Sequence, residues 1–388
     1  MKKDMKKVNV ALIGTGWAGA MHARSYQKVT GGLCSLKTVC SLEPNLEEFA
    51  FKWNFEFFTN SYEKVLKDPL IDVIDIVTPP NLHEEMVKQA LKAGKHVICE
   101  KPLTGSFDKS SGKKMLKDAE QKLKEIQAEI EKSGKILCYA ENWIYSPPFM
   151  RAVELIEKKK TVVPLIYGQT GHKGSHAKHA AYWKANGGGT LIRQGSHPIA
   201  AAIYLKKKEL EAREERFGIQ SVFCDASCIT KEWSEQEKGA LHTSSFDVED
   251  WAQVVITFSD GTKATIMSGD MLLGQIYNRM EVFGNDSVYQ INMTPNNLLE
   301  TYMANDTGIE QEELMEKSEG NTGWQHTLVI EDIIRGYAGQ LQDFLECIAY
   351  GRKPQSDFAL ARDTLKVIYA AYQSAEEERK IILENRKE

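Results

Sequence analysis

The sequence predicts an α/β fold for residues 1–145 and an α+β fold for residues 146–388. Two observations carry this prediction. In the first part, short apolar runs alternate with helix-like segments, a pattern typical of a parallel sheet covered by helices. In the second part, strand-like segments follow one another without helices between them, which predicts a largely antiparallel sheet. The prolines at Pro147–Pro148 break the chain between the two patterns and mark the expected domain boundary.

The composition is that of an ordinary globular protein and argues against several functional classes. The 388 residues carry a net charge of −5, whereas a nucleic-acid partner would usually require a basic face. No apolar stretch approaches the length of a membrane span, and the run after the lysine-rich N-terminus is too short for a signal peptide. The seven cysteines are scattered and odd in number, so we expect buried free thiols in a reducing compartment. The sequence thus predicts a cytoplasmic protein with no nucleic-acid and no membrane partner.

The first strand is expected over Val8–Ile13, and it runs directly into the turn GTGWAG. Gly14 permits a tight turn, Gly16 lets a pyrophosphate approach the backbone, and Gly19 lets helix and strand pack closely. The following helix presents unpaired N–H groups to that anion. An ordinary glycine-rich turn is the alternative, but the strand before it and the helix after it favour a dinucleotide site. The expected cofactor contacts here are Gly14, Thr15, Gly16, Trp17, Ala18 and Gly19.

The second strand, expected over Leu36–Leu42, ends where dinucleotide-binding folds usually carry an Asp or Glu that binds the adenosine ribose. Ser41 occupies this place. A site for NADP would want an Arg or Lys nearby, and Leu42, Glu43 and Pro44 supply none. The sequence therefore favours NAD as the cofactor, with Ser41 as a contact, and does not exclude NADP.

The third strand, Asp72–Thr78, leads into a loop of the kind that binds ligands at the carboxyl edge of a parallel sheet. Prolines end the strand, and Asn81 is predicted to cap the next helix. His83 is interpreted either as a cofactor contact or as an ordinary surface histidine in a first helical turn. The expected cofactor contacts of this loop are Thr78, Pro79, Asn81 and His83.

The fourth strand, Lys95–Pro102, ends in the tripeptide EKP at the same edge. A lysine beside a nicotinamide can hydrogen-bond a substrate hydroxyl and favour its alkoxide. Lys101 is therefore expected to be catalytic, and both Glu100 and Lys101 are expected to contact the cofactor. An amphipathic helix within Phe107–Gly134 then leads to a further strand, Lys135–Ala140.

Five strands are expected in the second part of the chain. The segment Ser259–Thr262 carries the Asp-Gly signature of a hairpin turn. Two polar segments, Lys231–Phe246 and Asn305–Asn321, are expected to be exposed loops. Apolar positions at helical spacing from Tyr337 to Tyr372 predict helices that pack back on the rest of the structure. The expected strands are Pro164–Gly171, Ile219–Ile229, Val248–Phe258, Lys263–Gly269 and Arg279–Phe283.

The segment after the first of these strands is rich in histidine. Metal binding by His172, His176 and His179 is disfavoured, because their spacing matches no strong zinc signature and no acidic residue or cysteine lies among them. Two alternatives stay open for the three histidines: binding of substrate hydroxyls and plain solvation in a loop. Trp143 and Trp183 either stack on a sugar ring or fill the core. No metal site is expected.

The glycines at Gly187–Gly189 offer a flexible turn for a close approach, and Thr190–Leu205 is expected to be a helix kinked at Pro198. Arg193 and His197 lie four residues apart, on one face of that helix. Histidine titrates near neutral pH, so His197 can move a proton during a hydride transfer. The alternative is a core histidine that the backbone satisfies.

Four motifs resemble those of the glucose–fructose oxidoreductase and inositol dehydrogenase (Gfo/Idh/MocA) family, in its order and with its approximate spacing. They are GTGWAG, TPPNLH, EKP and GGGTLIRQGSHPI. The resemblance covers nearly the whole chain. It implies an N-terminal Rossmann domain and a C-terminal domain with an open sheet that often serves oligomerisation, so we expect a homo-oligomer, a dimer or tetramer. It also implies an active site between the two domains.

The resemblance further implies NAD(P)-dependent hydride transfer at a secondary hydroxyl or ketone of a sugar, polyol or glycoside. Lys101 matches the family lysine that orients substrate and cofactor, and His197 matches the acid–base histidine. Two alternatives stay open: a glycosidase that oxidises its substrate transiently with bound NAD, and a non-catalytic dinucleotide-binding regulator. The presence of both Lys101 and His197 argues against a regulator, which needs neither.

One departure from the family pattern concerns Arg193, which stands where an aspartate is common four residues before the histidine. An arginine does not orient the imidazole as a carboxylate would. It can bind an acidic group of the substrate in a bidentate manner, or it can pair with an acidic residue of the second domain. The expected substrate contacts are Trp143, His172, His176, His179, Trp183, Arg193 and His197.

Overall fold

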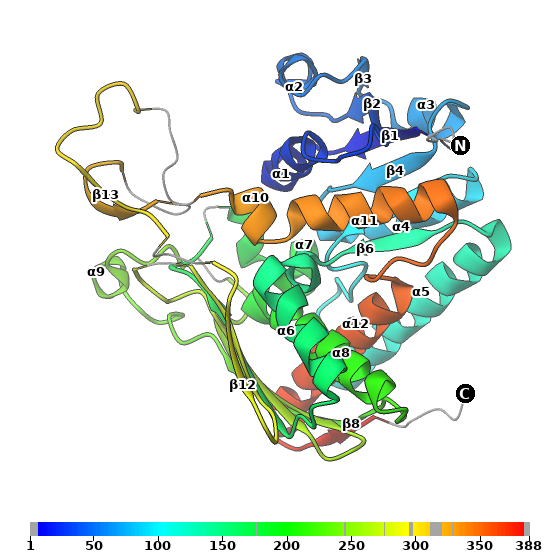
Figure 1. Ribbon diagram of the computed structural model, residues 1–388. Helices are drawn as coiled ribbons and strands as arrows, with labels where there is room; N and C mark the ends of the chain where they lie inside the picture. Colours follow the sequence, from blue (N-terminus) through cyan, green and yellow to red (C-terminus); the bar gives the residue numbers. More distant parts are fainter. Residues whose placement is uncertain are drawn as a thin grey trace.

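The computed structural model contains two large β-sheets with helices between them (Figure 1). It describes residues 7–175, 177–243, 246–274, 276–294, 298–310, 320–327 and 329–383. A six-stranded sheet forms in the N-terminal part of the chain and a seven-stranded sheet in the C-terminal part, from which a two-stranded arm extends. One continuous cluster of buried apolar side chains joins the helices and strands of both parts.

Every strand pair of the six-stranded sheet is parallel, in the order β3-β2-β1-β4-β5-β6. The central strands are apolar and buried, as expected when helices cover both faces. The strand order reverses between β1 and β4, which is where such sheets open a crevice for ligands. The predicted α/β architecture is therefore confirmed as a Rossmann fold. Its strands are β1 (Val8–Ile13), β2 (Cys34–Cys40), β3 (Phe57–Thr59), β4 (Val73–Ile76), β5 (His96–Glu100) and β6 (Leu137–Ala140).

The helices of this part follow the strands as the sequence predicts, with one correction. The prediction that Asn81 caps a helix is wrong, because α4 already begins at Pro80. Proline suits the first helical position, where its φ is already fixed and its missing N–H costs no hydrogen bond. The helices are α1 (Trp17–Tyr26), α2 (Leu46–Lys52), α3 (Tyr62–Lys67), α4 (Pro80–Lys92) and α5 (Gly112–Ser133).

The seven-stranded sheet has the order β12-β11-β7-β10-β9-β8-β15. The pair of β10 with β7 is parallel and the other pairs are antiparallel, which confirms a mostly antiparallel sheet. The predicted hairpin joins β9 to β10, and Gly261 in its turn has a φ of +92°. The strands are β7 (Leu165–Gly171), β8 (Ile219–Ser227), β9 (Trp251–Phe258), β10 (Lys263–Gly269), β11 (Tyr277–Phe283), β12 (Val288–Asn292) and β15 (Ile381–Ile382).

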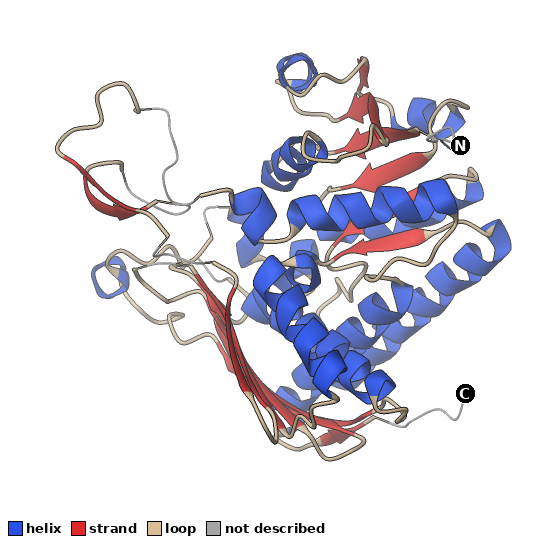
Figure 2. Ribbon diagram, in the orientation of Figure 1, coloured by secondary structure: helices blue, strands red, loops and turns tan. Residues whose placement is uncertain are grey.

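Helices cover one face of the seven-stranded sheet, and within the described ranges its other face carries no helical layer (Figure 2). Helix α8 packs on β7 and α12 packs on β8. This arrangement confirms the open sheet that the family resemblance implies. The longer helices of this part are α6 (Pro147–Lys159), α8 (Ser196–Ala212), α11 (Tyr337–Tyr350) and α12 (Phe358–Glu377).

The C-terminal helices also contact the six-stranded part: α11 packs against α1, and α12 packs against α5. All seven cysteines are free thiols, and five of them are buried. Among the helices of the described ranges, none combines the length and apolar character that a membrane span requires.

Short elements complete the C-terminal part. The arm consists of β13 (Glu300–Met303) and β14 (Gly323–His326). One of the two expected loops contains a one-turn helix, and residues 244–245 and 311–319 of these loops lie outside the described residues. The helical turns are η1 (Asn142–Tyr145), η2 (Lys178–Ala181), α7 (Trp183–Asn186), η3 (Leu191–Gly195), α9 (Glu235–Lys238) and α10 (Glu331–Ile334).

Candidate active site

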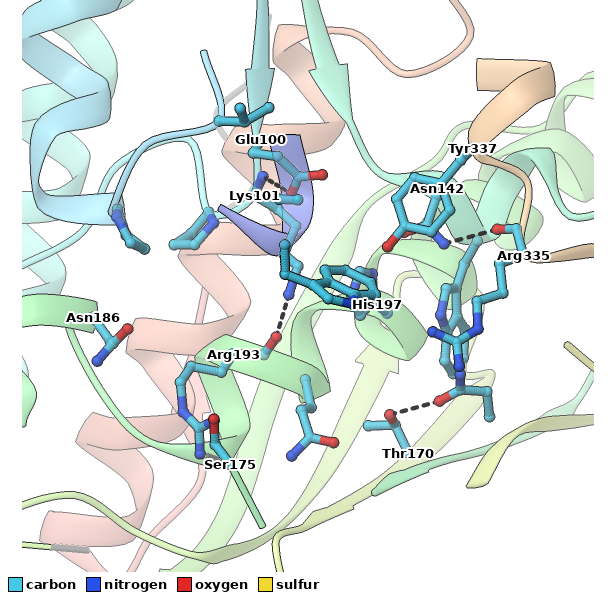
Figure 3. A pocket seen from close by; sticks show the side chains of 18 of the residues that line it. Glu100, Lys101, Asn142, Thr170, Ser175, Asn186, Arg193, His197, Arg335 and Tyr337 are labelled. Atoms are coloured by element: carbon cyan, nitrogen blue, oxygen red, sulfur yellow. Dashed lines mark hydrogen bonds between the residues drawn. The ribbon is translucent and has the colours of Figure 1, made fainter. Parts of the chain in front are cut away.

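A cavity of about 340 Å³ opens between the carboxyl ends of the first sheet and the near end of the second sheet (Figure 3). Loops after β1, β4, β5 and β6 form one wall, and residues near β7, β11 and η3 form the opposite wall. The cavity is lined by Trp17, Ala18, Val77, Thr78, Pro80, Glu100, Lys101, Pro102, Asn142, Trp143, Thr170, His172, Ser175, His179, Asn186, Arg193, Gln194, His197, Ile276, Asn278, Arg335 and Tyr337.

The glycine turn before α1 fits a dinucleotide diphosphate. A Cβ on Gly16 would meet nothing within 4 Å, whereas a Cβ on Gly19 would lie 2.4 Å from the carbonyl oxygen of Gly14. Gly16 is thus open toward a ligand, and Gly19 is required by packing within the chain. In the described structure no side chain caps α1, and its first turn holds no acidic residue. The amides at its N-terminus are therefore available to an external anion.

The end of β2 presents a hydroxyl at the place expected to face the adenosine ribose. Thr15 Oγ1 donates a hydrogen bond to Ser41 Oγ at 2.9 Å, and the amide of Glu43 donates to the same oxygen at 3.2 Å. Ser41 is thereby tied to the glycine turn. The side chain of Leu42 points into solvent and is 88% exposed.

Lys101 follows directly on β5, and its amine reaches across the cavity. Its amide donates to Glu100 Oε2 at 2.9 Å, and its Nζ donates to the carbonyl oxygen of Arg193 (Figure 3). A carbonyl oxygen has two lone pairs, so the oxygen of Arg193 can accept from the lysine besides a helical donor. Burial lowers the pKa of Lys101, and the carboxylates of Glu100 and Glu141 offset part of this effect.

His197 in α8 is held by groups at the end of β6. Its Nδ1 lies 2.7 Å from Glu141 Oε1, and its ring stacks on Trp143 with centroids 5.6 Å apart and planes at 7°. A carboxylate beside Nδ1 favours the proton on that nitrogen, which leaves Nε2 as the basic nitrogen. Burial lowers the pKa of His197 below its ordinary value, although Glu141 acts in the opposite direction. The lowered pKa favours the neutral form of the ring, which can accept a proton. Glu141 contributes the orienting carboxylate that Arg193 does not.

Arg193 pairs with an acidic residue of the second sheet, which is one of the two alternatives left open by the sequence. Its guanidinium binds Asp270 just beyond β10, and Gln194 Nε2 donates to the other oxygen of that carboxylate. The helix irregularity expected at Pro198 takes the form of the π-helical turn η3, which precedes that proline. Arg193 and His197 both line the cavity.

The turn before η3 is clamped rather than loosely placed. Both carboxylate oxygens of Glu249 accept from the amide of Gly189, at 3.0 and 2.9 Å, and Oε1 also accepts from the amide of Leu191 at 2.9 Å. Tyr372 Oη donates to the same oxygen at 2.9 Å. Tyr369 Oη donates to the carbonyl of Gly187 at 3.0 Å. The predicted close approach is present, with groups of this chain as the neighbours.

The far side of the cavity is formed by the end of α10 and the start of α11. The sequence predicts helices from Tyr337 onward, but it does not predict their place at the cavity. Asn142 Nδ2 donates to the carbonyl of Arg335 at 2.7 Å (Figure 3). The ring of Tyr337 contacts the ring of Trp17 edge-on, with centroids 6.4 Å apart. Arg335 also forms an ion pair with Glu331 at 3.0 Å. This segment thus connects the second part of the chain to the glycine turn before α1.

Several residues predicted at the site lie elsewhere. His83 is buried behind the cavity wall, with Nδ1 2.7 Å from the carbonyl of Pro102 and Nε2 2.8 Å from that of Thr78, so the interpretation as a surface histidine is wrong. Trp183 is buried in the interior and donates to the carbonyl of Ser106 at 2.8 Å. Pro79 and Asn81 are exposed and lie outside the cavity lining, and His176 lies outside the described residues.

Two of the three clustered histidines line the cavity. His172 Nδ1 accepts the amide of Gly174 at 3.0 Å, so Nε2 carries the proton in the neutral ring. Burial lowers the pKa of His179, and the charge of Arg193 lowers it further. Among the described residues, no group of three or more His, Cys, Asp or Glu is arranged to hold a metal ion.

The remaining lining residues differ in how readily the sequence could reveal them. Glu141 and Asn142 directly follow a buried parallel strand, so the rule that singles out Lys101 applies equally to them. Arg335 and Tyr337 carry no comparable signal, because only the packing of α11 on α1 brings them to the cavity.

Comparison with known families identifies both parts of the chain. Residues 8–130 match the family model described as "Oxidoreductase family, NAD-binding Rossmann fold". Residues 167–383 match the model described as "Oxidoreductase family, C-terminal alpha/beta domain". The myo-inositol 2-dehydrogenase of Thermotoga maritima is 24% identical over 379 residues, which cover 97% of this chain and 99% of that protein.

Two solved structures share the fold over nearly their whole length. GenD2 from gentamicin A biosynthesis, in complex with NAD, superposes with a TM-score of 0.80 at 21% identity and covers 99% of this chain and 98% of GenD2. Levoglucosan dehydrogenase, in complex with NADH and levoglucosan, has a TM-score of 0.74 at 21% identity and covers 97% of this chain and 99% of that protein.

Proposed function

We propose that this chain, which belongs to the Gfo/Idh/MocA family of NAD-binding oxidoreductases, transfers a hydride at a secondary hydroxyl or ketone of a sugar or polyol. The observation that supports this most directly is the presence of Lys101 and His197 in one cavity, although 96 positions separate them in the sequence (197 − 101). An amine that donates and an imidazole that accepts are the two groups that oxidation of an alcohol requires.

In the direction of oxidation, His197 Nε2 takes the proton of the substrate hydroxyl. Lys101 Nζ donates a hydrogen bond to the same oxygen and stabilises the negative charge that develops on it. Glu141 holds the imidazole in the tautomer that leaves Nε2 basic, and its charge stabilises the imidazolium once the proton has arrived. Reduction of a ketone uses the same groups in reverse order.

NAD is the cofactor that the N-terminal part fits, and when bound it supplies the acceptor for the hydride. The open amides before α1 suit its diphosphate, and Ser41 with Thr15 suits the adenosine ribose. Glu100, Lys101 and Thr78 face the cavity from the neighbouring strand ends. Ser41 carries no charge that would repel a ribose phosphate, so we expect weaker use of NADP rather than its rejection.

The cavity suits an uncharged, hydroxyl-rich substrate. Arg193 is neutralised by Asp270, and Arg335 by Glu331. Thr170, His172, His179 and Asn278 add polar groups, and Trp17 adds an aromatic face suited to a sugar or inositol ring. The printed names of the relatives, myo-inositol 2-dehydrogenase and levoglucosan dehydrogenase, agree with such a substrate.

We also propose that residues 1–145 form the cofactor domain and residues 146–388 the substrate and oligomerisation domain. Two copies of the chain would associate through the face of the seven-stranded sheet that carries no helical layer in the described ranges. Tyr167 in β7 and Phe223 in β8 lie on that face and are 43% and 42% exposed. Thr265 and Val255 lie between them in register. A second copy would bury this row of side chains.

The experiment is a substrate panel followed at the nicotinamide absorbance, with NAD and NADP in parallel. Its members are myo-inositol, scyllo-inositol, glucose, levoglucosan and a chromogenic glucoside. We expect NADH formation with at least one polyol or sugar, and a loss of about 10²- to 10⁴-fold in kcat for Lys101→Ala with NAD affinity retained. Unchanged turnover in Lys101→Ala would refute the role of the amine. Cleavage of the glucoside without net NADH would point to hydrolysis through transient oxidation.

A further inference from the structure

A buried histidine on the helix that follows the glycine turn lies between two carboxylates. His22 in α1 is fully buried. Its Nδ1 lies 2.8 Å from Asp75 Oδ2, and its Nε2 lies 3.2 Å from Glu100 Oε1. Asp75 belongs to β4 and Glu100 ends β5, so this one side chain connects α1 to two central strands. The hydroxyl of Tyr26 donates to the same oxygen of Asp75 at 2.8 Å.

The geometry indicates the charge of this histidine. An ionised carboxylate only accepts hydrogen bonds, so both ring nitrogens of His22 must donate if both contacts are hydrogen bonds, and a ring with two N–H groups is an imidazolium. The groups that face the ring are Asp75, Glu100 and the edge-on ring of Tyr337, at a centroid distance of 6.2 Å. Burial alone would lower the pKa of His22, but Asp75 and then Glu100 raise it to about 10.

Glu100 is the link between this cluster and the cavity. Its Oε1 faces His22, and its Oε2 accepts the backbone amide of Lys101. The amine of Lys101 is directed to the carbonyl of Arg193. The charged groups around that amine are Glu100, Glu141 and Arg193. Without His22, the Glu100 carboxylate would attract the amine of Lys101. The amine would then favour its charged form, paired with that carboxylate.

We propose that His22 is a positioning residue for Lys101: as a buried cation it engages the Glu100 carboxylate and thereby keeps that carboxylate from pairing with the amine that donates to the substrate oxygen. The proposal rests on the function proposed for Lys101. A merely structural link between a helix and a sheet would not need this device, because apolar side chains make such a link without the cost of burying three ionisable groups. His22 also lies on α1, whose N-terminus fits the cofactor diphosphate. One helix therefore contacts both the expected cofactor site and the Glu100 carboxylate.

The first test is independent of turnover. The full-length protein is labelled with ¹⁵N-histidine, and the His22 ring is assigned by the loss of its signal in His22→Gln, or in His22→Phe if that variant does not fold. We expect both ring nitrogens to be protonated from pH 7 to pH 8.5. A neutral ring, with one unprotonated nitrogen at pH 8, would overturn the proposal. Because no substrate is needed, this result stands whether or not the proposed hydride transfer is found.

The second test measures the titration of Lys101 by competitive acetylation with acetic anhydride and mass spectrometry, with exposed Lys117 as the internal reference. We expect the midpoint of Lys101 to rise by about one pH unit in His22→Gln and to fall in Glu100→Gln. The double variant should behave like Glu100→Gln, because His22 acts through that carboxylate. An unchanged midpoint in a folded His22→Gln variant would overturn the proposal, since a structural role alone does not predict these opposite shifts. If His22→Gln does not fold, an unchanged midpoint in Glu100→Gln has the same meaning.

Discussion

One glycine-rich turn precedes α1, and another precedes η3 and α8. The two differ in whether a side chain of this chain bonds the amides at the start of the following helix. At the turn before α1, no side chain in the described structure caps the helix, and the space beside Gly16 is open. At the turn before η3 and α8, Glu249 fills the equivalent place with its own carboxylate, bonded to the amides of Gly189 and Leu191. A carboxylate of this chain thus occupies the position at one turn that a cofactor phosphate would occupy at the other.

Glycine spacing alone therefore does not identify an anion site. Beside Gly16 the space is open for a ligand, whereas beside Gly189 the backbone of Glu249 fills it. The second turn consequently acts as a rigid mount: it fixes the start of the helix that carries Arg193 and His197.

The largest effect is expected for Gly189→Ala. A Cβ at this position would lie 2.0 Å from the carbonyl oxygen of Glu249, which is backbone and does not yield easily. We expect a loss of about 3 kcal/mol in the free energy of unfolding, or failure to fold. Thermal and urea unfolding measure it. A variant as stable as the parent would mean that the turn is not clamped.

The next effect is expected for Glu249→Ala, which leaves the amides of Gly189 and Leu191 and the hydroxyl of Tyr372 without their acceptor. A cost of about 2 kcal/mol follows from unsatisfied buried donors. Glu249→Gln is the matched control, because an amide oxygen can still accept from these groups. We expect it to lose much less stability. Equal losses in the two variants would show that the charge, rather than the acceptor, holds the turn.

Gly16→Ala should separate the ligand from the fold. Its Cβ meets nothing in the protein, and Gly16 has no positive φ, so the unfolding transition should not move. The methyl group would instead meet the cofactor, and we expect NAD to bind at least about tenfold more weakly by calorimetry. Unaltered NAD affinity would place the diphosphate away from this turn.

The smallest effect concerns the pH dependence of kcat/KM, which should respond to a change at Glu141 but not to one at Glu249. Because burial lowers the pKa of His197, the acid limb of kcat/KM should lie below the ordinary histidine value of about 6.5. Glu141 raises that pKa, so Glu141→Gln should move the limb about one pH unit further down. Glu249→Gln should leave the limb in place, since Glu249 only holds the turn. If the acid limb shifted in Glu249→Gln and not in Glu141→Gln, then Glu249 rather than Glu141 would set the pKa of His197.

Much of the fold follows from local sequence features. Buried parallel strands such as β1 and β5 are continuous apolar runs, and the Asp-Gly hairpin between β9 and β10 has its own turn chemistry. The strands β3 and β15 are not predicted, because two or three partly exposed residues at a sheet edge carry no periodicity. β3 is defined as a strand only by its pairing with β2, and β15 only by its pairing with β8.

The site was predictable where a residue follows a strand end or a motif, as for Lys101 and His197. The strand-end rule also applies to Glu141, but its contact with His197 was not predictable, because it joins residues 56 positions apart in different elements. The wall formed by Arg335 and Tyr337 depends on the packing of α11 against α1, and the hydrogen bond from Asn142 to Arg335 spans 193 positions. Such contacts are tertiary and leave no mark in local spacing.

Lys101 and His197 are expected to face one nicotinamide ring in the cavity. A crystal structure of the full-length chain with NADH would decide this. We predict the diphosphate against the amides of the Gly14–Gly19 turn, and the nicotinamide in the cavity with its C4 facing Lys101 Nζ and His197 Nε2. A nicotinamide outside the cavity, or either side chain turned away from that ring, would contradict the account.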